Sequence, residues 1–191
     1  MPTRSFVVPF TDITITPDSV KSGFISPALV TACRAVNVAL FVSGNLRRDV
    51  EITVTQGSPD ELKAITFLGA SLRRVSPDER SISFFLMKAD TKLSEMGSGS
   101  SIVMDNGIVV GKCTIEELLE GWSGRPLFVA ARTRGEGHFD SQLKPDGVYI
   151  YDPAGVLSGW IVVHASSILR FKRTPERFIL DVNRHFDVSS V

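Results

Sequence analysis

Segments with the hydrophobic spacing of helices follow segments with the spacing of strands along this 191-residue chain, and this order is compatible with few architectures. Apolar residues at helical spacing cover 27–43, and a strand-type alternation over 50–55 follows them. A short run rich in strand formers at 64–68 predicts a second, more buried strand, and 126–131 and 148–151 predict two more. Strands and helices that alternate in this way favour an α/β layered domain.

Polar signals set the expected ends of several helices. Ser76-Pro77-Asp78-Glu79 predicts a helix with Ser76 as its cap residue, Pro77 in the first helical position and Glu79 completing a capping box. Thr114 and Glu117 form a second such box. Both helices should therefore start sharply.

Three further segments complete the reading of the chain. Asp105-Asn106-Gly107 predicts a hairpin across 102–110, which we interpret as an insertion. The apolar positions in 160–169 predict a helix. A last helix is expected to begin at Thr174-Pro175, and the tail 187–191 is expected to be loose.

Composition excludes several classes of protein. Lys plus Arg and Asp plus Glu both total 21, so no overall field attracts nucleic acid, and any RNA contact must come from local patches. No apolar run approaches the roughly 20 residues of a membrane span. The two cysteines lack a metal-ligand spacing, so we expect no metal site and a reducing cytoplasm. The length suits one domain, 1–191.

Two strings carry a resemblance to a known family. They are Asn45-Leu46-Arg47-Arg48-Asp49-Val50 and the run that ends in Arg73-Arg74-Val75-Ser76-Pro77-Asp78-Glu79-Arg80. Both resemble the archaeal-type tRNA pseudouridine N1-methyltransferases of the SPOUT class. The resemblance implies a Rossmann-like, mostly parallel sheet with a C-terminal trefoil knot at about 126–170, a homodimer, and methyl transfer to pseudouridine in tRNA.

The same resemblance implies that S-adenosylmethionine is held by the knot loops, largely through backbone groups. Glycine suits such loops because it puts no side chain between the backbone and a ligand. The expected cofactor-binding residues are Val129, Ala130, Ala131, Gly135, Gly137, Tyr151, Pro153, Gly159 and Ile161.

Four carboxylates are candidates for withdrawing the N1 proton of pseudouridine, which makes N1 a better nucleophile. Asp49, Asp78 and Glu79 come from the two strings, and Asp152 comes from a knot loop. Each also has a structural interpretation. Asp78 and Glu79 favour the start of a helix, Asp49 can pair with Arg47 or Arg48, and Asp152 precedes Pro153 as in many turns.

The expected RNA contacts are basic, with one histidine that could act near neutral pH. The candidate substrate-binding residues are Arg47, Arg48, Arg73, Arg74 and His138. Ordinary solvated charge explains the arginines equally well.

Two alternative functions remain open at this point. Ala28 and Val30 stand where the family has an Arg-x-Asp pair, and Arg132 and Trp160 depart from its knot loops. These departures fit a small-molecule or nucleoside tailoring enzyme on the same scaffold. They also fit a descendant that no longer uses the cofactor.

Overall fold

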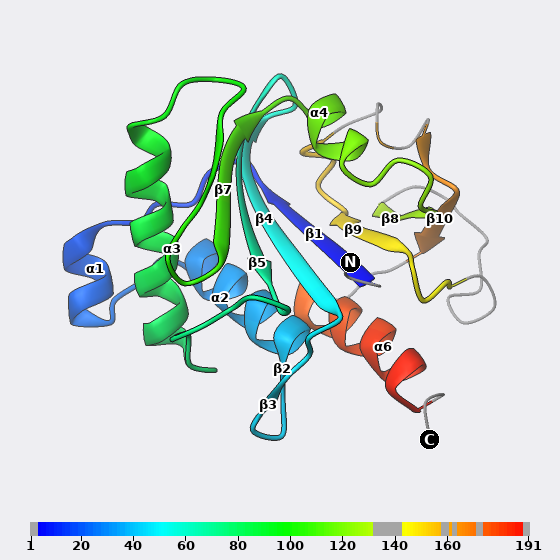
Figure 1. Ribbon diagram of the computed structural model, residues 1–191, viewed down its shortest axis with the longest axis horizontal. Helices are drawn as coiled ribbons and strands as arrows, with labels where there is room; N and C mark the ends of the chain where they lie inside the picture. The colour runs from blue at the N-terminus through cyan, green and yellow to red at the C-terminus, as the bar shows by residue number, and fades with distance from the viewer. Residues whose placement is uncertain (1–3, 132–142, 158–160, 162–163, 171–173, 189–191) are drawn as a thin grey trace.

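The computed structural model describes residues 4–131, 143–157, 161, 164–170 and 174–188, which form one large mixed sheet with helices on both faces (Figure 1). The strands are β1 (Arg4–Phe10), β2 (Phe41–Val42), β3 (Asn45–Leu46), β4 (Val50–Ser58), β5 (Glu61–Leu68), β6 (Ser101–Val103), β7 (Ile108–Cys113), β8 (Leu127–Ala131), β9 (Val148–Asp152) and β10 (Ser167–Arg170). The helices are α1 (Pro17–Ser22), α2 (Pro27–Leu40), α3 (Glu79–Ser94), α4 (Ile115–Glu120) and α6 (Pro175–Val188).

The main sheet has eight strands in the order β10-β8-β9-β1-β4-β5-β7-β6. Its first five strands are all parallel, and β5, β7 and β6 continue it with antiparallel pairings. The expected α/β class with a mostly parallel, Rossmann-like sheet is therefore confirmed. Because the five parallel strands run the same way, their amino ends share one edge of the sheet and their carboxyl ends share the other.

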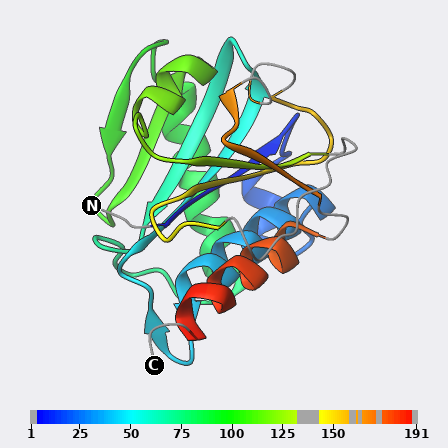
Figure 2. The same cartoon turned by 90° about the vertical axis from the view of Figure 1, so that its right-hand side faces the viewer.

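Each face of the sheet has its own hydrophobic core. On one face, Phe6, Ile52 and Phe67 pack with buried residues of α2, α3 and α6. On the other, Val7 and Ile150 pack with residues of α4 and of the chain after β9. Figure 2 shows α4 on the opposite side of the sheet from α2 and α6.

The helix starts are close to those expected, with one correction. Thr114 and Glu117 form the capping box of α4, as predicted. Ser76, however, is not the cap of the next helix: Asp78 caps α3, and Glu79 is its first residue. The reason is the geometry of the preceding segment, because the Pro77 carbonyl accepts a 2.6 Å hydrogen bond from Asn37 Nδ2 and holds that segment outside the helix.

The hairpin expected at 102–110 exists, and it is part of the main sheet. Strand β7 pairs with β5 from Leu62 opposite Cys113 to Phe67 opposite Ile108, so the hairpin extends the main sheet.

The prediction of a helix over 160–169 was wrong for its last residues, because Ile168 and Leu169 lie in β10 beside β8. The two side chains pack into opposite cores. A strand covered on both faces reads as a continuous apolar run, which periodicity does not distinguish from a helix. The same ambiguity hid β1, which the sequence analysis did not predict.

The tail is ordered further than expected. Helix α6 continues to Val188 and therefore includes Asp187. The carboxylate of Asp187 is bound by Arg4 and Arg47, which come from distant parts of the chain. Long-range ion pairs of this kind leave no local trace in the sequence.

Candidate functional site

The carboxyl ends of β8, β9 and β10 meet at one edge of the sheet, which we call the carboxyl edge. Ala131 is level with Asp152 on one side and with Arg170 on the other. Open parallel sheets bind ligands beyond the carboxyl ends of their strands. The carboxyl edge is therefore where a ligand of this fold is expected.

The structure brings several expected cofactor residues together at this edge. Val129, Ala130 and Ala131 are buried on β8, and Tyr151 lies next to Ala130 on β9. Ile161 is buried in the same core as Val129 and Ala131, and Pro153 follows β9 directly. Gly135, Gly137, His138 and Gly159 lie outside the described residues.

Tyr151 is half-buried, and its ring centroid lies 5.6 Å from that of Phe178 in α6. Burial raises the pKa of the Tyr151 hydroxyl, and the nearby Glu176 carboxylate raises it further. The hydroxyl therefore remains protonated at neutral pH and acts as a hydrogen-bond donor rather than as a base.

Asp152 is 5% exposed, and its carboxylate holds the chain that leaves β9. Oδ1 accepts a 2.7 Å hydrogen bond from the Val156 amide, and Oδ2 accepts one of 2.9 Å from the Leu157 amide. Asp152 thus fixes the direction of this loop.

Asp78 and Glu79 lie at the start of α3. Asp78 Oδ1 accepts a 2.8 Å hydrogen bond from the Ser81 amide, which is the bond of a helix cap. Glu79 Oε1 lies 3.0 Å from Arg34 Nε in an exposed ion pair between α3 and α2. The geometry gives both carboxylates a structural partner.

The opposite edge, which we call the amino edge, carries a network of charges. Arg4 Nη2 lies 3.1 Å from Asp49 Oδ2, and Arg4 Nη1 lies 3.1 Å from Asp187 Oδ1. Arg4 is thus a partner of Asp49 besides the expected candidates Arg47 and Arg48. Arg47 binds Asp187, with Nη2 2.9 Å from Oδ2. Strand β1, strand β4 and helix α6 are joined by these pairs.

The four arginines expected to bind substrate lie near this edge in two different environments. Arg47 is 9% exposed, and its Nη1 donates to the carbonyls of Val38, Ala39 and Phe41 at the end of α2. Arg48 is exposed and donates to the Gly69 carbonyl at 3.1 Å. Arg73 and Arg74 are exposed as well. Arg47 thus stabilises the fold, whereas the other three face solvent.

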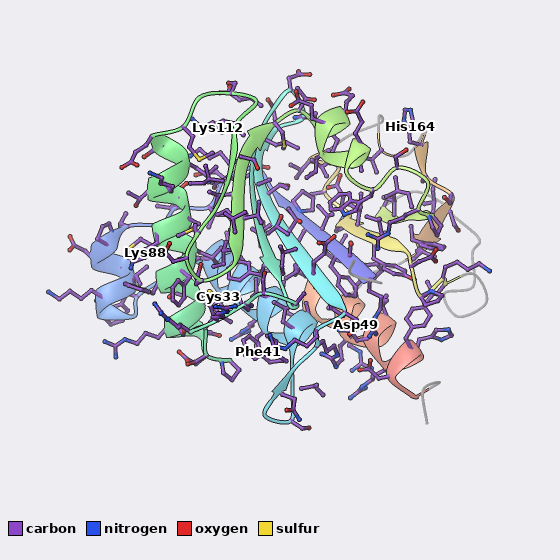
Figure 3. All side chains as sticks on the ribbon, viewed as in Figure 1. Cys33, Phe41, Asp49, Lys88, Lys112 and His164 are labelled. Atoms are coloured by element: carbon purple, nitrogen blue, oxygen red, sulfur yellow. The ribbon has the colours of Figure 1, made fainter. Side chains whose placement is uncertain are left out.

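The strand register gives the separation of the two edges. Val148 is level with Ser5, and Ser5 is level with Glu51, so Asp152 lies about six residues further along the strand direction than Asp49. At about 3.3 Å per residue this is roughly 20 Å. Figure 3 shows Asp49 beside α6, far from Lys112 at the other end of the sheet.

One polar cluster was missed by the sequence analysis altogether. Glu51 Oε1 accepts hydrogen bonds from the Ser5 hydroxyl and from Trp122 Nε1, and Arg125 Nη1 donates to Ser5 Oγ at 2.8 Å. Alternation in 50–55 marked Glu51 as an outward residue, but the cover that buries it comes from the chain after α4. The sequence offered no signal for that contact.

Two further findings concern ligands and membranes. Within the described ranges, no group of three or more His, Cys, Asp or Glu side chains is placed to hold a metal ion. None of the helices in the described part of the chain is long and apolar enough to cross a bilayer.

Comparison with known proteins gives the family and its relatives. A family model described as "Putative SAM-dependent RNA methyltransferase" matches residues 9–158. A tRNA (pseudouridine(54)-N(1))-methyltransferase of Methanococcus vannielii is 36% identical over 123 residues, which are 62% of this chain and 60% of the relative. The enzyme of the same name from Methanococcus maripaludis strain C5 is 52% identical over 109 residues, 56% of this chain and 48% of the relative.

A third relative of that name, from Methanosarcina mazei, is 38% identical over 96 residues, 50% of this chain and 44% of the relative. The matches thus cover less than two thirds of each relative's length. All three relatives are named for RNA modification. Their names favour methyl transfer to tRNA over a small-molecule tailoring enzyme and over a descendant that no longer uses the cofactor.

Proposed function

The chain belongs to the SAM-dependent RNA methyltransferase family, and on that premise we propose that it transfers a methyl group from S-adenosylmethionine to N1 of pseudouridine in tRNA. The observation that carries the proposal is the carboxyl edge, where three adjacent parallel strands end beside Val129, Ala130, Ala131 and Tyr151. The names of the relatives support pseudouridine in tRNA as the proposed substrate.

The described residues at this edge fit the cofactor. Ala130 and Ala131 are small residues at the end of β8, so no long side chain of this strand occupies the space beyond it. Val129, Tyr151, Pro153 and Ile161 would complete this side of the site, and Gly135, Gly137 and Gly159 the loops. S-adenosylmethionine, when bound, supplies an electrophilic methyl group on its sulfonium.

The strand order also supports a SPOUT-type knot at about 126–170. The chain forms β8, then β9 beside it, and then β10 on the other side of β8. In this proposal residues 1–191 act as one domain. Two free cysteines, Cys33 and Cys113, fit a reducing compartment such as the cytoplasm.

Asp152 serves in this proposal as a positioning residue. Both of its oxygens are engaged by loop amides, so it sets the path of the chain beyond β9 rather than accepting the N1 proton. Asp49, Asp78 and Glu79 have no catalytic role in it, because each is tied to a structural partner away from the carboxyl edge.

The substrate site spans two subunits of a homodimer. Arg48, Arg73 and Arg74 lie near the amino edge, roughly 20 Å from the carboxyl edge of the same chain. A reacting base is much smaller than this separation. In this proposal the exposed arginines bind the backbone of a tRNA whose pseudouridine reacts at the carboxyl edge of the partner subunit. His138 would contact the tRNA that reacts at the carboxyl edge of its own chain.

The first experiment measures transfer of a labelled methyl group from S-adenosylmethionine to a tRNA transcript that carries pseudouridine at position 54 of its T-loop. The same transcript with uridine at that position is the control. Label in the pseudouridine transcript alone supports the proposal. Label in neither transcript, with folded protein and saturating cofactor, contradicts it.

A second experiment tests the shared site by mixing two inactive chains. One carries Arg48→Glu and Arg73→Glu, and the other carries Gly137→Val in the expected cofactor loop. A site built from two subunits regains about a quarter of the wild-type activity, because half of the dimers are mixed and each has one intact site. A mixture that stays inactive, although both chains dimerise, contradicts the shared site.

A further inference from the structure

A groove of about 410 Å³ crosses the sheet face that carries α4, on the strands β4, β5 and β7 and apart from the carboxyl ends of β8, β9 and β10. Its floor consists of outward residues of β5 and β7, namely Ala64, Thr66 and Val109. Leu118 and Trp122 form one wall, and 99–101 before and at β6 form the other. The volume lies within the range of about 300–1,000 Å³ that is usual for small-molecule sites.

Glu51 lines the groove although it is 6% exposed. Its Oε1 accepts the hydrogen bonds from Ser5 and from Trp122 Nε1, the latter at 2.8 Å. Its Oε2 receives no hydrogen bond from the residues that the structure describes. Oε2 is not one of the fully buried side-chain atoms that lack a partner among the described residues, so it opens into the groove and offers a hydrogen-bond acceptor there.

The charge of Glu51 is already balanced in the folded chain. Arg125 Nη1 lies 3.9 Å from Oε1, and its side chain is 19% exposed. A second full cation in the groove would gain little and would repel Arg125. The favoured ligand therefore carries neutral, polarised N–H donors rather than a positive charge.

The remaining surfaces favour a flat, mainly apolar ligand. The side chains of Trp122, Leu118 and Val109 provide apolar contact on two sides. Nucleobases combine a flat ring with hydrogen-bonding edges, and proteins recognise unstacked bases by such packing and by their Watson–Crick edges. Guanine is the base whose Watson–Crick edge presents a ring N–H and an amino group side by side.

We infer that this groove binds a guanine base, with Glu51 Oε2 accepting from its ring N–H and amino group. The inference does not depend on methyl transfer, since the groove lies on a face of the sheet rather than at the carboxyl edge. The base comes either from a free nucleoside or from single-stranded RNA, and both present the same edge.

Isothermal titration of the full chain with guanosine tests the inference, with inosine, adenosine and spermidine as comparison ligands. Guanosine is expected to bind saturably, inosine more weakly because it lacks the amino group, and adenosine and spermidine at least about tenfold more weakly still. The pentanucleotides UUGUU and UUAUU distinguish the source. Tighter binding of UUGUU than of guanosine identifies RNA, and equal binding identifies the nucleoside.

The matched variants are Glu51→Gln and Glu117→Gln. Both remove one negative charge from the lining of the groove, but glutamine at 117 keeps the capping box of α4. Guanosine affinity should fall by at least about tenfold in the first variant and stay within about twofold in the second. Equal losses in both variants would overturn the inference, as would the absence of saturable guanosine binding by the wild-type chain.

Val109→Phe provides a test that leaves Glu51 untouched. Val109 is half-buried on the floor of the groove, so a larger side chain there fills the space without altering the carboxylate. Loss of guanosine binding with an unchanged melting temperature supports the site. Retained binding would place the nucleoside elsewhere and overturn the inference, even if Glu51→Gln does not fold.

Discussion

The two edges of the parallel strands use charge in opposite ways. At the amino edge, Arg4 and Arg47 are buried and pair with Asp49 and Asp187, so charges from distant segments lock β1, β4 and α6 together. At the carboxyl edge the strands end in small apolar residues, and Asp152 holds the backbone of a loop. The same residue types therefore stabilise the fold at one edge and shape a site at the other.

The largest expected effect is a loss of stability at the amino edge, caused by a clash with the backbone. A Cβ on Gly69 would lie 1.9 Å from the Arg47 carbonyl oxygen and 2.7 Å from that of Val50. Gly69→Ala should lower the free energy of unfolding by about 4 kcal/mol, because both contacts are with backbone. Urea denaturation measures the change. Gly97→Ala is the control, since no atom lies within 4 Å of its added Cβ. Equal stability of the two variants would contradict the close approach.

The second largest effect on stability is expected when one buried charge is removed from the same edge. Arg47→Met keeps the length of the side chain but removes the donors to Asp187 Oδ2 and to the carbonyls of Val38, Ala39 and Phe41. The free energy of unfolding should fall by about 3 kcal/mol. The exposed neighbour, changed as Arg48→Met, should alter stability by less than about 0.5 kcal/mol. If both variants lose tRNA binding and neither loses stability, Arg47 belongs to the substrate patch instead.

At the carboxyl edge, a smaller loss of stability should accompany a larger loss of activity. Asp152→Asn replaces one of two accepting oxygens with an amide group that faces an N–H donor. We expect a loss of about 2 kcal/mol in unfolding free energy. Methyl transfer under saturating substrate should drop further than stability explains at a temperature where the variant is folded. The exposed turn residue changed as Asp146→Asn is the comparison. Full activity of the Asp152→Asn variant would contradict the proposed role of Asp152 in positioning the loop.

The smallest effect is a pH dependence at the carboxyl edge. The pKa of Tyr151 is raised in the folded chain, by burial first and by Glu176 second. Its contribution to stability is therefore complete below the unfolded value near 10 and is lost as pH rises through the folded pKa. Between pH 9 and 11, the wild-type chain should lose stability more steeply than Tyr151→Phe in urea titrations. Parallel curves for the two proteins would show that the hydroxyl does not experience this environment.

Much of the fold and part of the site followed from local patterns. The alternation in 50–55 and the capping box at Thr114 depend on neighbours within a few residues, and both are present in the structure. The strands that end at Ala131 and Asp152 were placed within one residue at each end. Their grouping at one edge follows once the strands are parallel.

The rest depended on partners far away in the chain. Asp49 binds Arg4, 45 residues earlier in the chain, and Arg47 binds Asp187, 140 residues further on. Strand β10 could not be told from a helix, because both of its faces are covered. The groove beside Glu51 depends on a tryptophan 71 residues away.

By itself the sequence determined the α/β class, most element boundaries and the strings that resemble the family, because periodicity and capping act between near neighbours. The tertiary structure alone decided which arginine is buried, which carboxylate holds a loop and which carboxylate opens into a groove. Burial and ion pairing depend on the arrangement of whole strands and helices, and a linear pattern of residues does not encode the distance between the two edges of a sheet.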